Sequence, residues 1–321
     1  MKTTKIILAL LLTAIAATAA AHEEPLSVVR PWGTMHGTLL APEQSGDAVV
    51  VLIAGSGPTD RNGNSGGALT TNSYLLLARA LENEGIASFR YDKRGVGASR
   101  FARPEEVRQE ELRFEDYIED AAAWIAPLRE RGFGRIILAG HSEGALIALE
   151  VAAAHPNEVT AVVSMAGAGY PIDEILLAQL GRELMTFNPG LLLRAQSIIA
   201  RIKAGESVTD VPPLLQPLFP AAVQPYLTSW MRYDPRRSIR RVTQPLLILN
   251  GDNDIQIPAD NAEALAAAQP AARKIIVKGM THLLKTSDIT DPQQQKIAHY
   301  TDSSLPISEE LVGHLAEFVR K

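Results

Sequence analysis

Short apolar runs alternate with amphipathic segments along most of this chain. The runs are nearly continuous in Val, Ile, Leu and Ala and lie at residues 48–53, 87–91, 135–139, 160–165, 245–249 and 274–277. Such runs are typical of strands buried on both faces of a parallel sheet. Between them, residues 74–84 and 114–131 have helical patterns. This alternation predicts an α/β fold with a mostly parallel, doubly wound sheet. Residues 26–30 and 34–40 predict an antiparallel hairpin ahead of it.

The alternation stops between residues 170 and 243. Apolar residues there recur at helical spacing, and several prolines then interrupt the pattern. We expect a helical cap inserted over the sheet at about residues 171–242, within a single domain of residues 22–321. A second, small helical domain is the alternative. A last amphipathic helix is expected from about Ser308, with Leu311, Leu315, Phe318 and Val319 on its buried side.

The first 21 residues have the pattern of an export signal. Lys2 and Lys5 precede an apolar stretch that ends in Ala19-Ala20-Ala21, a small-residue cleavage pattern. The charge-free stretch is shorter than the roughly 20 residues that a membrane-spanning helix needs. We therefore expect cleavage after Ala21 and export to a bacterial periplasm or beyond, without stable membrane insertion. An uncleaved anchor is the alternative.

Composition narrows the possible chemistry. The 321 residues are 46% hydrophobic and 21% charged, with 31 Lys plus Arg against 36 Asp plus Glu, a net charge of −5. A mildly acidic chain is a poor candidate for binding nucleic acid. Because the sequence has no cysteine, disulfides, thiolate catalysis and cysteine-based metal sites are excluded.

The pattern Gly-x-Ser-x-Gly occurs twice, at residues 63–67 and 140–144. Ser142 follows an expected strand and opens an expected helix, which is the strand–turn–helix setting of a nucleophile elbow. Ser65 lies in a Gly/Asn-rich stretch with no strand directly before it. Ser142 is therefore the predicted nucleophile, and Ser65 a loop residue.

A serine nucleophile needs a base, and the base needs an orienting group. His282 follows the run at 274–277, so it should lie at the carboxyl edge of the sheet together with Ser142. His141 adjoins Ser142 but should point away from it. The sequence has seven histidines: His22, His36, His141, His155, His282, His299 and His314.

The orienting acid should follow the run at residues 245–249. Asp252 and Asp254 both qualify by position, and the spacing after Gly251 favours Asp254. The resulting chain order, Ser142, Asp254 and His282, is the Ser…Asp…His order expected of a fold with this nucleophile elbow.

In these motifs, the mature chain resembles the α/β-hydrolase superfamily, in its esterase and serine-aminopeptidase-like branch. The resemblance includes the elbow at 140–144, the acid loop at 250–258, the histidine loop at 279–282, the turn at 91–99 and a loop at 55–63 similar to an oxyanion loop. Many relatives have His-Gly where this chain has Ala54-Gly55. The resemblance implies that the oxyanion is held by the backbone N–H of Glu143 and that of Ser56, with Gly57 as the alternative to Ser56.

We therefore expect an exported carboxylesterase that acts on small-molecule esters of small or medium acyl groups and needs neither a metal nor an organic cofactor. A serine aminopeptidase-type peptidase or amidase with the same triad is the alternative. It would require an acidic subsite, for which Asp173, Glu174 and Glu183 are candidates. A non-catalytic binding protein on this fold is disfavoured because all three triad residue types are present. No oligomeric state is predicted.

Overall fold

The computed structural model describes residues 22–67 and 69–321, so the predicted export signal at 1–21 lies outside the described residues. Its centre is a nine-stranded sheet in the order β1-β2-β4-β3-β6-β7-β8-β9, with the short β5 paired to β2. The strands are β1 (His22–Arg30), β2 (Gly33–Ala41), β3 (Ala48–Ile53), β4 (Ala87–Tyr91), β5 (Arg100–Phe101), β6 (Arg135–His141), β7 (Ala161–Met165), β8 (Leu246–Gly251) and β9 (Arg273–Val277).

The pairing confirms the predicted sheet. Every neighbouring pair from β4 through β9 is parallel, whereas β1, β2 and β4 pair antiparallel. All six apolar runs form strands, and the expected hairpin is β1–β2. The pairing of His141 with Met165 and of Gly251 with Val277 places the carboxyl ends of β6 to β9 at one edge.

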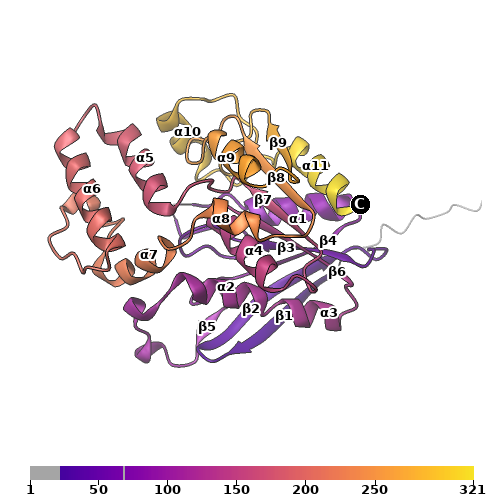
Figure 1. Cartoon of the computed structure of the whole chain (residues 1–321). Helices are drawn as coiled ribbons and strands as arrows, with labels where there is room; N and C mark the ends of the chain where they lie inside the picture. Colours follow the sequence, from indigo (N-terminus) through magenta and orange to yellow (C-terminus); the bar gives the residue numbers. More distant parts are fainter. Residues whose placement is uncertain (1–21, 68) are drawn as a thin grey trace, which may run out of the picture.

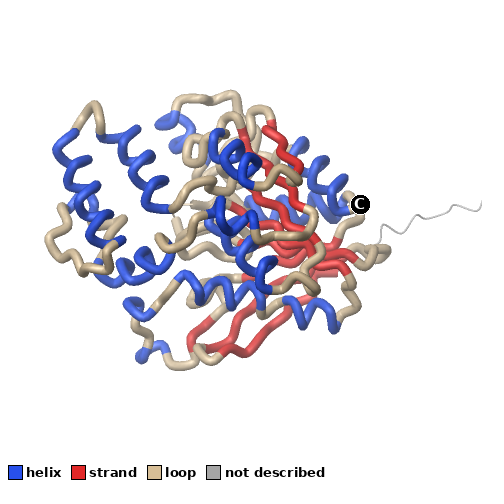
Figure 2. Tube along the Cα trace, in the orientation of Figure 1, coloured by secondary structure: helices blue, strands red, loops and turns tan. Residues whose placement is uncertain are grey.

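Helices cover both faces of the sheet (Figure 2). They are α1 (Ser73–Asn83), α2 (Phe114–Ala122), α3 (Ile125–Glu130), α4 (Glu143–Ala154), α5 (Ile172–Leu184), α6 (Pro189–Lys203), α7 (Gln224–Trp230), α8 (Pro235–Arg240), α9 (Asp260–Ala268), α10 (Pro292–His299) and α11 (Glu309–Val319). Four short 3₁₀ turns accompany them: η1 (Pro104–Glu106), η2 (Gln109–Glu111), η3 (Pro213–Leu215) and η4 (Ala221–Val223).

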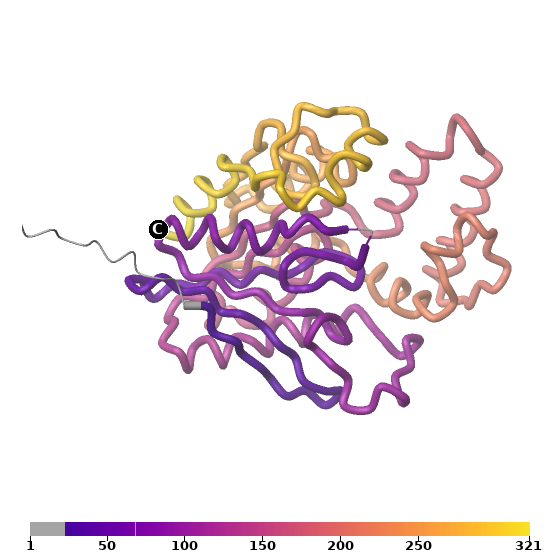
Figure 3. The backbone as a smooth tube through the Cα atoms, turned by 180° about the vertical axis from the view of Figure 1, so that it is seen from behind, coloured from indigo at the N-terminus to yellow at the C-terminus, as the bar shows by residue number. Residues whose placement is uncertain are grey.

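Alternate residues of the strands enter two separate cores. In β3, Val49 and Val51 pack with residues of α2, α3, α4 and α9, whereas Val50 and Leu52 pack with residues of α1 and α11. Seen from behind, α1 and α11 lie side by side over the second face (Figure 3). Because a strand exposes successive side chains on opposite faces, the continuous apolar runs are explained by burial on both sides.

One predicted helix is divided. The pattern at residues 114–131 forms two helices, α2 and α3, instead of the single helix expected. Pro127 has no N–H to donate to the carbonyl of Ala123, and its ring would clash with that carbonyl, so a continuous helix cannot pass this point.

Residues 171–242, which we call the helical insertion, lie between β7 and β8 and contain α5 to α8. Figure 1 shows α5 and α6 extending away from the sheet, whereas α8 lies close to it. α8 packs against α4 and α9, and α5 packs against α6. In the part of the chain that the structure describes, no helix combines the length and apolarity required to cross a membrane.

Candidate active site

Ser142 occupies a sharp turn between β6 and α4. Its backbone has φ 55° and ψ −119°, a conformation that L side chains rarely adopt and that needs support from its surroundings. The two motif glycines allow this turn. A Cβ on Gly140 would lie 2.0 Å from the carbonyl oxygen of Gly144, and one on Gly144 would lie 2.2 Å from that of Ile53. The sequence folds into an elbow here because only hydrogen atoms fit at these two positions.

His282 and Asp254 form a buried pair on neighbouring loops. The distance from His282 Nδ1 to Asp254 Oδ2 is 2.8 Å, and Asp254 Oδ1 accepts the backbone N–H groups of Gln256 and Ile257 at 2.8 Å each. An ionised carboxylate only accepts hydrogen bonds, so Nδ1 is the protonated ring nitrogen and Nε2 is left as the basic one. This is the arrangement that a general base requires.

Asp252, the alternative acid, has another contact. Its Oδ1 accepts the backbone N–H of Gly279 at 2.6 Å, and the residue is exposed. Of the two carboxylates, Asp254 is thus the one in contact with His282.

Ser142 and His282 line one cavity, although no hydrogen bond joins Ser142 Oγ to His282 among the described residues. Hydrogen bonds between catalytic groups are often long in unliganded sites and shorten when substrate binds. The structure brings the three candidate residues to the same edge of the sheet, and their catalytic roles remain a prediction.

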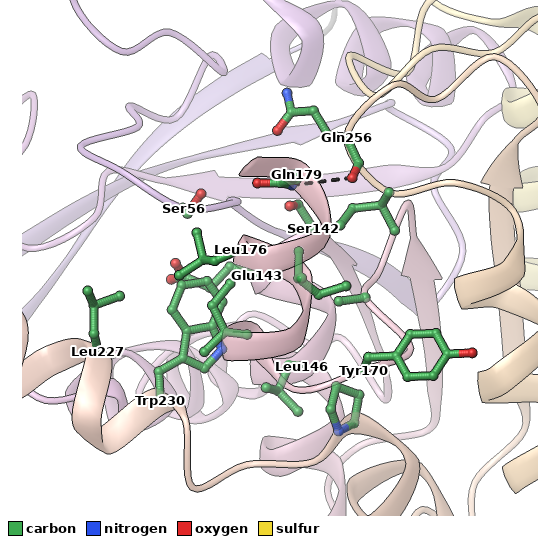
Figure 4. Close-up of a pocket in the computed structure, with 15 residues that line it drawn as sticks. Ser56, Ser142, Glu143, Leu146, Tyr170, Leu176, Gln179, Leu227, Trp230 and Gln256 are labelled. Atoms are coloured by element: carbon green, nitrogen blue, oxygen red, sulfur yellow. Dashed lines mark hydrogen bonds between the residues drawn. The ribbon is translucent and has the colours of Figure 1, made fainter. Parts of the chain in front are cut away.

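Two small cavities meet at Ser142. One, of about 120 Å³, is lined mainly by apolar residues of α4 and the helical insertion, including Leu146, Ile175, Leu176, Leu227 and Trp230. Figure 4 shows several of these side chains gathered beside Ser142. The other, of about 90 Å³, is more polar and includes Thr59, Thr71, Tyr74, His282 and Tyr300. Ser56, Ser142 and Gln256 line both cavities.

The loop after β3 packs directly on the elbow. A Cβ on Gly55 would lie 3.2 Å from Ser142 Cβ, so the glycine permits this close approach. Gly55 N–H donates to Tyr74 Oη at 3.0 Å. Among the described residues, the backbone N–H groups of Ser56, Gly57 and Glu143 form no hydrogen bond within the protein. Of the four N–H groups in these two segments, only that of Gly55 is therefore paired within the described part of the protein.

His141 has a role that the sequence did not indicate. Its Nδ1 is 2.8 Å from Tyr74 Oη, and its Nε2 is 2.7 Å from the backbone oxygen of His282. A carbonyl only accepts, so Nε2 carries the proton, and Tyr74 donates its own proton to Nδ1. Burial, followed by repulsion from His282, lowers the pKa of His141 to about 3, so its ring stays neutral. This neutral histidine supports the backbone of the histidine loop.

The sequence also did not indicate a buried ion pair at Glu143, the residue after Ser142. Lys93 Nζ lies 3.1 Å from Glu143 Oε1 and 3.0 Å from the backbone oxygen of Gly55. In the sequence, Lys93 was only part of the turn at 91–99, and the side chain of Glu143 had no predicted role. The one indication in the sequence was a lysine inside this turn. If such a lysine is buried, it needs a charged partner, because buried lysines are rare unless paired.

Other polar candidates are paired within the protein. Arg61 donates to Asp92, which also accepts the backbone N–H of Ala98. Burial opposes the charged form of Asp92, but the hydrogen bonds from Arg61 and Ala98 outweigh it and hold its pKa below the usual range. Arg236 is bidentate to Asp234, and Arg241 pairs with Glu150. Asp92 in the turn at 91–99, and Arg236 and Arg241 after it in the chain, are therefore held in ion pairs within the protein.

The acidic residues of the helical insertion do not form a subsite around Ser142. Asp173 pairs with Lys203, and Glu183 pairs with Lys296 at 2.5 Å. Glu174 lies 3.9 Å from Arg236 and outside the two cavities at Ser142. Within residues 22–67 and 69–321, no cluster of three or more His, Asp or Glu side chains is arranged to hold a metal ion.

The sheet order, the elbow and the loops that carry Asp254 and His282 define an α/β hydrolase. The family model described as "Serine aminopeptidase, S33" matches residues 64–286, more than half of the chain, so the chain belongs to this family.

Individual relatives are more distant. The chain is 29% identical over 227 residues to 2-(acetamidomethylene)succinate hydrolase of Mesorhizobium japonicum, which covers 67% of this chain and 78% of the relative. Proline iminopeptidase of Mycobacterium smegmatis has a similar structure, with a TM-score of 0.59 and 14% identity over 92% of this chain and 98% of its own. The Pyrococcus furiosus esterase Pf2001 matches with a TM-score of 0.57 and 14% identity, over 94% and 91% of the two chains. At these identities, the two structural matches establish the fold alone.

Proposed function

We propose that this hydrolase is an exported carboxylesterase that cleaves esters of small or medium acyl groups through an acyl-enzyme. One observation carries the proposal. The strained turn at Ser142 lies where two small cavities meet. One is lined mainly by apolar side chains, and the other contains a histidine held by a buried carboxylate.

In the proposed reaction, Ser142 Oγ attacks the ester carbonyl while His282 Nε2 takes its proton. Asp254 holds the imidazole in the required tautomer and stabilises its charged form. The backbone N–H groups of Ser56 and Glu143 stabilise the oxyanion, and one such donor is typically worth about 100- to 1000-fold in rate. His282 then returns the proton to the leaving alcohol, and water, activated by the same histidine, releases the acid.

The cavities favour an ester with an apolar acyl group. We assign the acyl group to the cavity lined by Leu146, Leu176 and Trp230, and the alcohol to the polar cavity beside His282. An ester lacks the ammonium group of an aminopeptidase substrate, which agrees with the pairing of Asp173 and Glu183 to lysines. The fold is shared with an esterase, which permits this activity without establishing it.

Amide hydrolysis is the second candidate. The matching family is described as serine aminopeptidase, and the named substrate of the Mesorhizobium relative is an acetamido compound. The same triad would act on an amide if His282 protonated the leaving nitrogen.

We further propose that residues 1–21 direct the chain out of the cytoplasm and are removed after Ala21. The basic start, the apolar stretch and the Ala-rich end support this part of the proposal. Fractionation of the producing cells and N-terminal sequencing of the mature protein would test it; a cytoplasmic protein that retains Met1 would contradict it.

The activity is tested with a series of p-nitrophenyl esters of increasing acyl length and with matched aminoacyl p-nitroanilides. We expect hydrolysis of the shorter esters, no comparable amide hydrolysis, and covalent labelling of Ser142 by a fluorophosphonate. Labelling together with cleavage of the anilides alone would establish the amidase alternative. A folded protein that is neither labelled nor active on any substrate would contradict both.

A further inference from the structure

Lys93 is a buried lysine whose ammonium group has its partners within the protein. It lies in the turn after β4, and only 4% of the residue is exposed. Its ammonium group is 3.0 Å from the backbone oxygen of Gly55 and 3.1 Å from Glu143 Oε1, and it lies 4.2 Å from the centre of the Tyr117 ring. One charged group therefore connects the loop after β3 to the first residue of α4.

These two segments carry the proposed oxyanion donors. In a trans peptide, the C=O and the following N–H point in opposite directions. Lys93 draws the Gly55 carbonyl towards itself and so turns the N–H of Ser56 the other way, while Tyr74 Oη accepts the N–H of Gly55. Both backbone polar groups of Gly55 are thus fixed, and the next free donor along the loop is Ser56, whose residue lines both cavities at Ser142.

Lys93 also contacts the residue that carries the other proposed donor, the backbone N–H of Glu143. Glu143 contributes its backbone N–H from the first position of α4, and its carboxylate is bonded to Lys93. A buried ion pair is weak evidence for stability, because an apolar pair of similar size often serves as well.

We propose that Lys93 is a positioning residue that sets the distance and direction between the two oxyanion donors, the N–H groups of Ser56 and Glu143. This inference rests on the proposed function, since it concerns the oxyanion hole of that reaction. It also selects Ser56 over Gly57 as the second donor.

The test compares Lys93→Met with Arg94→Met in the mature protein. Arg94 is the neighbouring residue and also forms a buried ion pair, with Asp120, but it contacts neither Gly55 nor Glu143. Active sites are counted by fluorophosphonate labelling, so that a lower yield of folded protein does not count as lower activity. A trifluoromethyl ketone, which forms an oxyanion on the nucleophile, serves as the transition-state analogue.

For Lys93→Met we expect kcat per active site to fall about 100-fold with little change in KM, which is the size expected when one oxyanion donor is misplaced. Affinity for the trifluoromethyl ketone should fall by a similar factor. Arg94→Met should lose thermal stability but keep its kcat per active site. The double variant Lys93→Met/Glu143→Gln, which buries no unpaired charge, should fold and keep the low kcat.

The outcomes separate the inference from the proposed function. If the wild type hydrolyses esters, and Lys93→Met or the double variant matches Arg94→Met in kcat and in ketone affinity, the positioning role is wrong and the esterase remains. If the wild type itself is neither active nor labelled, the proposed function fails, and the oxyanion role of Lys93 fails with it.

Discussion

The same five-residue pattern has two different structures in this protein. At 140–144, Gly-x-Ser-x-Gly joins β6 to α4 and holds Ser142 at φ 55°. At 63–67, the pattern lies in a loop held by backbone and side-chain hydrogen bonds: Asp60 N–H donates to the carbonyl of Asn64, and the Asp60 carboxylate accepts the backbone N–H groups of Asn62 and Asn64.

The second glycine of each motif shows one difference between the two regions. A Cβ on Gly144 would meet the Ile53 carbonyl oxygen at 2.2 Å, whereas a Cβ on Gly67 would meet no atom of the described, non-adjacent residues within 4 Å. In the elbow, glycine is required by crowding between a strand, a helix and the neighbouring strand. The loop at 63–67 has no such crowding at Gly67. The motif therefore indicates a nucleophile only where a strand precedes it and a helix follows it.

The largest expected effect tests this comparison directly. Ser142→Ala should lower ester hydrolysis by at least about 10⁴-fold, because the remaining groups can bind substrate but cannot form the acyl-enzyme. Ser65→Ala should stay within about twofold of the wild type, since the change is a small one on a loop outside the elbow. Both are measured as kcat/KM on one p-nitrophenyl ester, and equal losses in the two variants would remove the distinction between the motifs.

Asp254 and Asp252, the two candidates for the orienting acid, allow a second comparison between similar residues. Asp254→Asn should lower kcat by about 10³- to 10⁴-fold, because an amide that keeps the backbone contacts of Oδ1 presents an N–H to His282 Nδ1 and favours the wrong tautomer. Asp252→Asn keeps an oxygen for Gly279 N–H and should remain within about threefold. A larger loss in Asp252→Asn than in Asp254→Asn would reverse our assignment.

Much of this arrangement was predictable from local sequence. The apolar runs gave the strands, because burial on both faces demands continuous apolar residues. The positions of Ser142, Asp254 and His282 follow from the rule that residues after parallel strands meet at one edge of the sheet. Fold and family were confirmed, whereas export and the ester substrate stay predictions.

What the sequence did not indicate are contacts between distant segments. The ring of His141 is bonded to Tyr74, 67 residues away, and to the backbone of His282, 141 residues away. Lys93 reaches Glu143 across 50 residues. No periodicity or spacing encodes such contacts, because they depend on how the loops fold over the sheet edge. The break of the helix at 114–131 coincides with Pro127, which the helical pattern of apolar residues does not reflect.

The glycines themselves give the third test. Gly144→Ala should destabilise the protein by about 3 kcal/mol, near the upper end for inserting a methyl group into a packed region, because its contact is backbone rather than a flexible side chain. Gly67→Ala should change the free energy of unfolding by less than about 0.5 kcal/mol, since its Cβ would enter open space. Urea denaturation measures both, and a Gly144→Ala variant as stable as Gly67→Ala would show that the elbow is less crowded than described.

The smallest expected effect is on the pH dependence of folding stability, and it concerns the residues before Ser142 and Ser65. His141 is buried with a pKa lowered to about 3, whereas the corresponding residue of the other motif is Asn64, which does not titrate. Because the unfolded chain binds a proton on this histidine below about pH 6.5 and the folded chain does not, folding stability falls as the pH drops from about 6.5 towards 3. Between pH 7.5 and 5, His141 should account for about 2 kcal/mol of this loss.

His141→Gln should be less stable at pH 7.5 but should lose about 2 kcal/mol less on acidification, whereas Ser65→Ala should keep the wild-type pH dependence. Urea denaturation at the two pH values measures the difference, and parallel losses in the wild type and His141→Gln would show that the ring is not held neutral.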